Sequence, residues 1–254
     1  MVSKLDTVSV IMPAFNVESV IEKSIKETSQ SLGDLDITYE IIVVDDGSKD
    51  ATRKVINSVN NKKIRILSYD QNRGKGFALT MGAINSLSKY VIFLDGDNEI
   101  NTDLISKYLI GLKHADIVVG SKMHPESVIV TPVMRKFLSL GFNVLVRLMT
   151  GINHPDTQVG FKAFRREALV DIMKLVSVRN YAFDVELLTI ANLLKMKIAL
   201  MPIKIESTSM FSIRAIIRML IDILGIAYRL RVKKWYQKNQ KKKFPPSYKP
   251  IIRW

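Results

Sequence analysis

Five short segments rich in apolar residues, each followed by polar or glycine-containing sequence, constrain the fold of this chain most strongly. Segments that are apolar at successive positions are typical of strands buried on both faces of a parallel sheet. Helical patterns between them predict helices over residues 17–31, 49–60 and 75–87, with Ser48 as the N-cap of the second. The alternation predicts right-handed βαβ units and a single Rossmann-like α/β domain with a mostly parallel sheet. The five predicted strands are residues 8–12, 40–44, 64–68, 90–94 and 117–119.

The second half of the chain is less regular. Pro202 interrupts one predicted strand there, which favours a place at the sheet edge. The apolar pattern over residues 212–232 predicts a helix with a broad apolar face. Such a helix fits a membrane interface, burial against the body or packing against a second copy in a homo-oligomer. The elements expected before it are helices over 131–150 and 182–195 and strands over 161–164 and 198–205.

The composition excludes several classes of site. The chain has no cysteine, so disulfides and thiolate metal sites are excluded, and its three histidines lack zinc-site spacing. A metal would therefore be a hard cation held by carboxylates. The short polar start over residues 1–6 argues against a secretory signal, and no run of 18 residues is free of charge. We expect a cytoplasmic catalytic domain without a transmembrane helix.

The positive charge is concentrated at the C-terminal end. The net charge is +14, and residues 229–254 contain ten Lys and Arg residues and no Asp or Glu. Such a tail is attracted to an anionic membrane surface, at about 1 kcal/mol for each basic residue near the surface. A solvated tail and a nucleic-acid contact are the alternatives. We divide the chain into a domain over 1–210, the apolar helix over 211–232 and a basic tail over 233–254.

Polar or acidic clusters follow three of the predicted strands. Pro13-Ala14-Phe15-Asn16, Asp45-Asp46-Gly47-Ser48 and Asp95-Gly96-Asp97-Asn98 would all lie at one edge, because ligands of such sheets bind beyond the carboxyl ends of the strands. Two carboxylates in a D-x-D turn can hold a divalent cation that neutralises a diphosphate. Near the next helix start, the segment from Asn72 to Gly76 has glycines that let the backbone approach an anion. Each motif alone is also found in ordinary turns.

Together and in this order, these motifs resemble the family 2 glycosyltransferases with the A-type nucleotide-sugar fold. Two later segments, Asp156-Thr157-Gln158-Val159-Gly160-Phe161-Lys162 and Ala182-Phe183-Asp184-Val185-Glu186-Leu187-Leu188, look like the dolichyl-phosphate β-glucosyltransferases and, less closely, the mannosyltransferases. The resemblance reaches to about residue 205. It implies inverting transfer of a hexose, glucose in preference to mannose, from UDP-glucose rather than GDP-mannose to a polyprenyl or dolichyl phosphate. The product would be a lipid-linked sugar donor for glycosylation.

The resemblance also implies the site residues. Asp95 and Asp97, with Glu99 as a third ligand, would hold Mg²⁺ or Mn²⁺; Glu99 would otherwise be a charge at a helix start. The nucleotide-sugar site is expected to contain Pro13, Phe15, Glu18, Asp45, Asp46, Lys75, Asp95, Gly96, Asp97, Gln158 and Lys162.

Four residues are implied in catalysis by the same resemblance: Asp97, Lys122, Arg135 and Asp184. Lys122 and Arg135 would hold the acceptor phosphate, which needs no general base because its second pKa is about 6. Asp184 would bind sugar hydroxyls or act as a base. The enzyme would then be peripheral on the cytoplasmic face of a membrane.

Three alternatives stay open at this stage. A glycosyltransferase with a soluble or glycan acceptor would need Asp184 as its base. A nucleotidyltransferase also uses a metal at such an edge, and the later segments disfavour it. A nucleic-acid-binding protein would use the basic tail, but acidic clusters repel phosphate, so no nucleic acid is expected.

Overall fold

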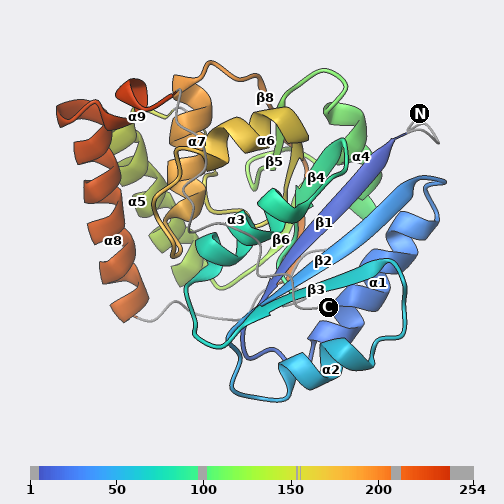
Figure 1. The fold of residues 1–254 in the computed structure, drawn as a ribbon. Coiled ribbons are helices and arrows are strands. Elements are labelled where there is room, and N and C mark those ends of the chain that lie inside the picture. Colours follow the sequence, from blue (N-terminus) through green and yellow to red (C-terminus); the bar gives the residue numbers. More distant parts are fainter. Residues whose placement is uncertain (1–5, 97–101, 153, 155, 207–212, 241–254) are drawn as a thin grey trace.

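Seven short strands form one mostly parallel sheet at the centre of the protein (Figure 1). The structure is a computed structural model that describes residues 6–96, 102–152, 154, 156–206 and 213–240, with the side chains of residues 133–138 and 213 excepted. Only β7 among these strands runs antiparallel to its neighbours, β4 and β5. The strands, in order across the sheet, are β3 (Ile64–Tyr69), β2 (Thr38–Asp46), β1 (Thr7–Ala14), β4 (Tyr90–Phe93), β7 (Lys162–Arg165), β5 (Ile117–Gly120) and β8 (Ile198–Met201).

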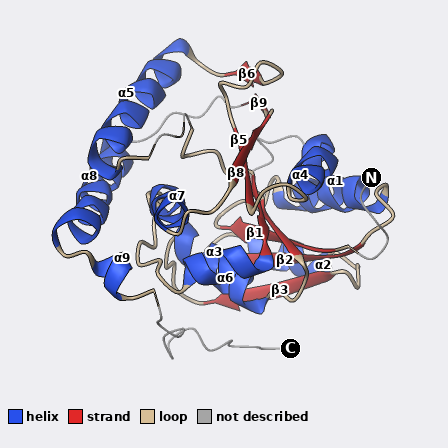
Figure 2. Cartoon of the chain, turned by 90° about the horizontal axis from the view of Figure 1, so that it is seen from above, coloured by secondary structure: helices blue, strands red, loops and turns tan. Residues whose placement is uncertain are grey.

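Helices cover both faces of this sheet, and a further group of helices packs outside one of these layers (Figure 2). One face carries α1 (Ile21–Gly33), α2 (Thr52–Ser58) and α4 (Ile105–Gly111), and a 3-10 turn, η1 (Thr102–Leu104), precedes α4. The other face carries α3 (Lys75–Asn85), α6 (Arg166–Met173) and α7 (Phe183–Leu193). The outer group contains α5 (Val133–Thr150), α8 (Ile213–Ala227), a π-helical turn η2 (Tyr228–Val232) and α9 (Trp235–Lys238). The predicted α/β fold with helices on both faces is confirmed.

The apolar strands are explained by burial on both sides. In β2, Ile42 and Val44 point into the core under α3 and α7, whereas Ile41 and Val43 point into the core under α1 and α2. Successive side chains of a strand face opposite ways, so both sets must be apolar when both faces are covered. The pattern that predicted a parallel sheet therefore has this physical cause.

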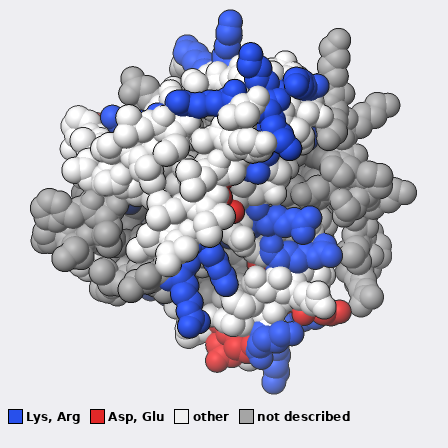
Figure 3. All heavy atoms as spheres, turned by 90° about the vertical axis from the view of Figure 1, so that its left-hand side faces the viewer, with Lys and Arg blue, Asp and Glu red and all other residues white. Residues whose placement is uncertain are grey.

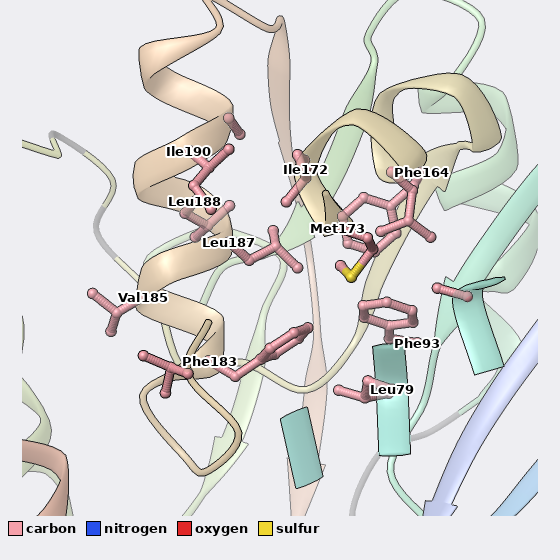
Figure 4. Close-up of a cluster of buried hydrophobic side chains, with 14 of the residues drawn as sticks. Leu79, Phe93, Phe164, Ile172, Met173, Phe183, Val185, Leu187, Leu188 and Ile190 are labelled. Carbon is pink, nitrogen blue, oxygen red and sulfur yellow. The ribbon is translucent and has the colours of Figure 1, made fainter. Parts of the chain in front are cut away.

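The larger core connects the sheet to the helices that carry later site residues (Figure 4). The rings of Phe93 in β4 and Phe164 in β7 have centroids 4.8 Å apart, and the Phe93 and Phe183 centroids are 6.3 Å apart. Ring pairs at these separations add about 0.5–1.5 kcal/mol to the burial of their area. Phe93 lies just before Asp95 in the sequence, and Phe183 lies directly before Asp184. This packing therefore fixes the end of β4 and the start of α7.

Several local predictions need correction. Ser48 is not the N-cap of the second helix, because α2 begins at Thr52 and its N-cap position is Ala51. The Ser48 hydroxyl instead accepts a hydrogen bond from the Asn16 amide at 3.1 Å. α1 begins at Ile21, four residues later than predicted from Val17. The apolar periodicity located these helices but not their ends.

The strand predicted over residues 198–205 is divided at Pro202 into two strands. β8 ends at Met201 on the edge of the sheet, as predicted, and the residues after Pro202 form β9 (Lys204–Glu206). β9 pairs in parallel with β6 (Val128–Val130) in a separate two-stranded sheet. No helix within the described residues has the length and apolar character needed to cross a bilayer.

α8, the helix predicted near the C-terminal end, occupies one of its predicted environments, because it packs against the body of the protein. Ile223 and Ile226 of α8 are buried in the larger core, whereas Ile217, Ile221 and Leu224 are exposed. α8 also packs beside α5 (Figures 1 and 2). Packing on the body is therefore observed, and the opposite side of the helix remains available.

Gly82 sets the distance between α3 and the sheet, and it gives a test of the packing. A methyl group added at Gly82 would lie 2.2 Å from Cγ2 of Ile11 in β1. We expect Gly82→Ala to lower the free energy of unfolding by about 1–3 kcal/mol, as overpacking does. Urea denaturation would measure it.

Gly141 in α5 is the matched control, because an added methyl group there meets no atom within 4 Å. We expect Gly141→Ala to be neutral or to stabilise the protein, since alanine favours a helix. Equal stability of the two variants would contradict the close packing of α3 on β1.

Candidate active site

The topology gathers the predicted residues at one edge of the sheet. β1, β2, β4 and β5 share one direction, so their carboxyl ends lie at the same edge. β7 runs the other way, and its first residue, Lys162, pairs with Phe93 of β4 and Val119 of β5. A residue from a distant sequence segment thus reaches the acidic edge through strand register alone.

The loops after β1 and β2 interlock by hydrogen bonds. The Asn16 amide donates to Ser48 Oγ at 3.1 Å, and Asn16 Oδ1 accepts from the Lys49 amide at 2.8 Å. Glu18 Oε2 accepts from the Ala51 amide at 2.6 Å. Asn16 has a φ of 52°, a left-handed conformation that asparagine tolerates better than most residues. The predicted nucleoside residue Glu18 therefore holds the start of α2.

Asp45 is buried within this pair of loops. Its Oδ1 accepts from the Ser48 amide at 3.0 Å, and its Oδ2 accepts from Arg53 Nε at 2.7 Å. Arg53 was not identified as a site residue from the sequence. Arg53 lies in α2, the helix that follows the Asp45-Asp46 pair in the sequence. Both oxygens of Asp45 thus shape the loop.

Asp46 holds the glycine-containing loop before α3. Its Oδ1 accepts from the Arg73 amide at 2.7 Å, and its Oδ2 accepts from the Gly74 amide at 2.9 Å and from Asn72 Nδ2 at 3.0 Å. Burial raises the pKa of Asp46, and the backbone donors of Arg73 and Gly74 oppose this shift. Asp46 therefore positions the loop that contains Gly74, which has a φ of 95° and is the N-cap of α3.

Asp95 and Lys75 form an ion pair at the end of β4. Lys75 Nζ lies 2.8 Å from both carboxylate oxygens of Asp95, and both side chains are partly exposed. A methyl group added at Gly160 would lie 2.1 Å from Asp95 Oδ2. Gly160 belongs to a segment noted in the sequence but was assigned no role. The structure gives it one, because any side chain there would displace the Asp95 carboxylate.

Lys162 and Asp184 form a second, buried ion pair behind the first. Lys162 Nζ lies 2.7 Å from Asp184 Oδ1 and also donates to the Val159 carbonyl. Burial lowers the pKa of Lys162, and Asp184 and Asp95 oppose this shift. The two pairs therefore bring Lys75, Asp95, Lys162 and Asp184 into one alternating group of charges.

Three predicted residues lie near the carboxyl ends of β1 and β4. Pro13 is half-buried in β1, and Phe15 is 44 % exposed just after it. Gly96 is buried, and a methyl group added there would lie 3.0 Å from the Pro13 carbonyl and from Ile21. Gly96 therefore allows the turn after β4 to approach β1.

Two further predicted residues lie after β5 and before β7. The Lys122 amide donates to Asp156 Oδ2 at 2.6 Å, so Asp156 holds the turn after β5. Gln158 Nε2 makes a long contact of 3.5 Å with the Tyr181 carbonyl. These contacts join the turn after β5 to the loop before α7.

Three predicted site side chains lie outside the part of the chain that the structure describes. Asp97 and Glu99 fall in residues 97–101, and the Arg135 side chain is excluded although its backbone belongs to α5. Their roles stay predictions. Within the described residues, no group of three or more acidic or histidine side chains is placed to hold a metal.

Comparisons with known proteins agree with this geometry. The sequence pattern of the family described as glycosyl transferase family 2 matches residues 9–173. A dolichyl-phosphate beta-glucosyltransferase of Dictyostelium discoideum is 34 % identical over 253 residues, covering 91 % of this chain and 77 % of the relative. The Homo sapiens protein of the same name is 32 % identical over 255 residues, covering 92 % and 79 %.

Solved structures support the fold. Glucosyl-3-phosphoglycerate synthase from Mycobacterium tuberculosis, in complex with Mn²⁺, uridine diphosphate and phosphoglyceric acid, has a TM-score of 0.67 and 21 % identity, covering 88 % of this chain and 78 % of that one. Its complex with Mn²⁺, UDP-glucose and glycerol 3-phosphate has a TM-score of 0.66 at 21 % identity, covering 88 % and 79 %. With its matched family pattern and its relatives, this chain belongs to glycosyl transferase family 2, in the group of the dolichyl-phosphate beta-glucosyltransferases.

Proposed function

We propose that this glycosyltransferase transfers glucose from UDP-glucose to the phosphate of a dolichyl or other polyprenyl phosphate. The relatives are named dolichyl-phosphate beta-glucosyltransferases and match over about nine tenths of the chain. The observation that carries the proposal is the group of Lys75, Asp95, Lys162 and Asp184 at the carboxyl edge of the sheet. Such an edge is where open α/β sheets bind their ligands.

The residues present fit a divalent metal at the end of β4. Asp95 supplies carboxylate oxygens, which hard cations prefer, and Gly160 keeps the space beside them free of a side chain. Asp97 and Glu99 are the proposed further ligands. When bound, a Mg²⁺ or Mn²⁺ ion would neutralise the charge that develops on the leaving diphosphate.

The predicted site residues have separate proposed tasks. Lys75, at the start of α3, binds the diphosphate together with the helix N-terminus. Asp184 is held by Lys162 at 2.7 Å, so this pair is suited to positioning the sugar. Lys122 and Arg135 bind the acceptor phosphate, which attacks the anomeric carbon from the face opposite the nucleotide. This acceptor is mostly deprotonated at neutral pH and requires no base.

A membrane contact is proposed for the outer helices. Exposed apolar side chains lie at helical spacing on α5 and on α8, and exposed arginines and lysines lie on and after α8. Figure 3 shows this side of the protein as a largely uncharged area bordered by Lys and Arg, with few acidic groups. The combination fits an anionic lipid surface, where the lipid acceptor resides. The exposed apolar residues on these two helices are Leu140, Val144, Leu148, Ile217, Ile221 and Leu224.

The reaction is tested by a transfer assay with labelled UDP-glucose or GDP-mannose and dolichyl phosphate in detergent. We expect label in the lipid phase from UDP-glucose with Mg²⁺ or Mn²⁺, and none with chelator or with Asp97→Ala. Metal-dependent hydrolysis of UDP-glucose without labelled lipid would contradict the acceptor assignment and leave the nucleotide-sugar site in place.

Gly160→Ala tests the geometry at Asp95. The added methyl group displaces the carboxylate, and we expect transfer to fall by up to about 100-fold, as a displacement of about 1 Å typically causes. Gly33→Ala is the control, because a methyl group there meets no atom within 4 Å. Unchanged transfer by a folded Gly160→Ala protein would remove Asp95 from the site.

Vesicle sedimentation tests the membrane contact. We expect binding to phosphatidylcholine vesicles that contain phosphatidylserine, weaker binding at high salt, and at least about a tenfold loss in the double variant Ile221→Asp, Leu224→Asp. Leu87→Asp is the control, because Leu87 is 81 % exposed but lies just before β4. Equal binding by both variants would argue against α8 as the contact.

A further inference from the structure

Glu186 is a buried carboxylate that receives five hydrogen bonds from segments far apart in the sequence. It lies in the first turn of α7 and is completely buried. Two amides and a hydroxyl come from the loop before α7: Ser177 N at 2.8 Å, Ser177 Oγ at 2.7 Å and Val178 N at 2.7 Å. Tyr236 Oη at 2.5 Å and Arg229 Nη2 at 3.1 Å come from the C-terminal segment.

The three side chains form a closed group. Arg229 Nε also donates to Tyr236 Oη at 3.0 Å, so each member contacts the other two. A buried carboxylate is tolerated only where a charge and hydrogen-bond donors compensate it. Burial raises the pKa of Tyr236, which keeps its hydroxyl protonated and able to donate to Glu186. Removing one member would leave polar groups without partners inside the protein.

The loop held by Glu186 reaches the active-site edge a few residues later. The Arg179 carbonyl accepts from the Gly76 amide at 2.8 Å and from the Phe77 amide at 3.3 Å. A methyl group added at Gly74 would lie 2.5 Å from the same carbonyl. The loop therefore fixes the first turn of α3, where Lys75 pairs with Asp95.

We propose that Glu186, Arg229 and Tyr236 are positioning residues through which the C-terminal segment sets the geometry of the donor-binding turn Gly74–Phe77. This inference rests on the proposed function, because it assigns that turn to the diphosphate of the nucleotide-sugar. The path runs from η2 and α9 through Glu186 to Ser177 and Val178, and then through Arg179 to α3. Residues beyond the matched family region thus contribute to donor binding.

Tyr236→Phe in the full chain is the first test, because it removes one hydroxyl and keeps the ring. We expect the KM for UDP-glucose and the Kd for UDP with metal to rise about fivefold, the order expected for one hydrogen bond. The KM for the lipid acceptor should stay unchanged. Tyr228→Phe is the control, since Tyr228 lies in η2 and is 50 % exposed.

Amide hydrogen exchange gives a readout that does not depend on activity. We expect Tyr236→Phe to speed exchange at the Gly76 and Phe77 amides, which bond to the Arg179 carbonyl, and Tyr228→Phe to leave it unchanged. Arg229→Lys, which keeps the charge but loses the guanidinium donors, is the second variant if Tyr236→Phe does not fold.

The outcomes separate this inference from the proposed function. A lower Tm in Tyr236→Phe with an unchanged KM for UDP-glucose, and unchanged exchange at Gly76 and Phe77, would make the cluster purely structural and overturn the inference. A wild-type protein that neither binds UDP nor transfers glucose would overturn the proposed function. Exchange at Gly76 and Phe77 would still decide whether the C-terminal segment holds the turn.

Discussion

The buried ion pair between Lys162 and Asp184 determines much of how the active-site edge is built. A lone ammonium group in this position would be prohibitively costly, so Asp184 and the Val159 carbonyl must accompany it. Lys162 reaches the edge only because β7 inserts antiparallel between β4 and β5. Asp184 reaches it because Phe183 packs near Phe93. The ion pair between Lys162 and Asp184 therefore depends both on core packing and on the direction of β7.

The acidic residues of this edge divide into two kinds. The carboxylate oxygens of Asp45 and Asp46 accept hydrogen bonds from the surrounding loops and from Arg53 of α2, so these two residues shape the loops. Asp95 is partly exposed, and the Lys75 ammonium group pairs with its carboxylate. A carboxylate at a strand end can therefore hold a loop in place or stay accessible to solvent. The hydrogen-bond donors around the carboxylate determine which of the two occurs.

Local patterns in the sequence were sufficient for β1 to β5 and for the acidic edge, but not for β6 or for the division of β8 and β9. Apolar runs identify strands buried on both faces, and the carboxyl ends of parallel strands must share an edge. The insertion of β7 could not be predicted, because a run of four residues carries no signal of direction or neighbour. Ser48 was misassigned because its hydroxyl serves a loop 32 residues away rather than the next helix. Gly160 and Glu186 lay in recognised segments, but only tertiary contacts give them roles.

α8 packs on the body of the protein and keeps part of its apolar surface exposed. α8 buries Ile223 and Ile226 against the body and leaves Ile217 and Ile221 exposed, so packing on the body does not use up its apolar surface. The same segment continues into Arg229 and Tyr236, which hold Glu186. A contact made by the exposed side of α8 with a lipid surface would therefore act on the segment that fixes the loop beside α3. Acceptor location and donor geometry would then share one structural element.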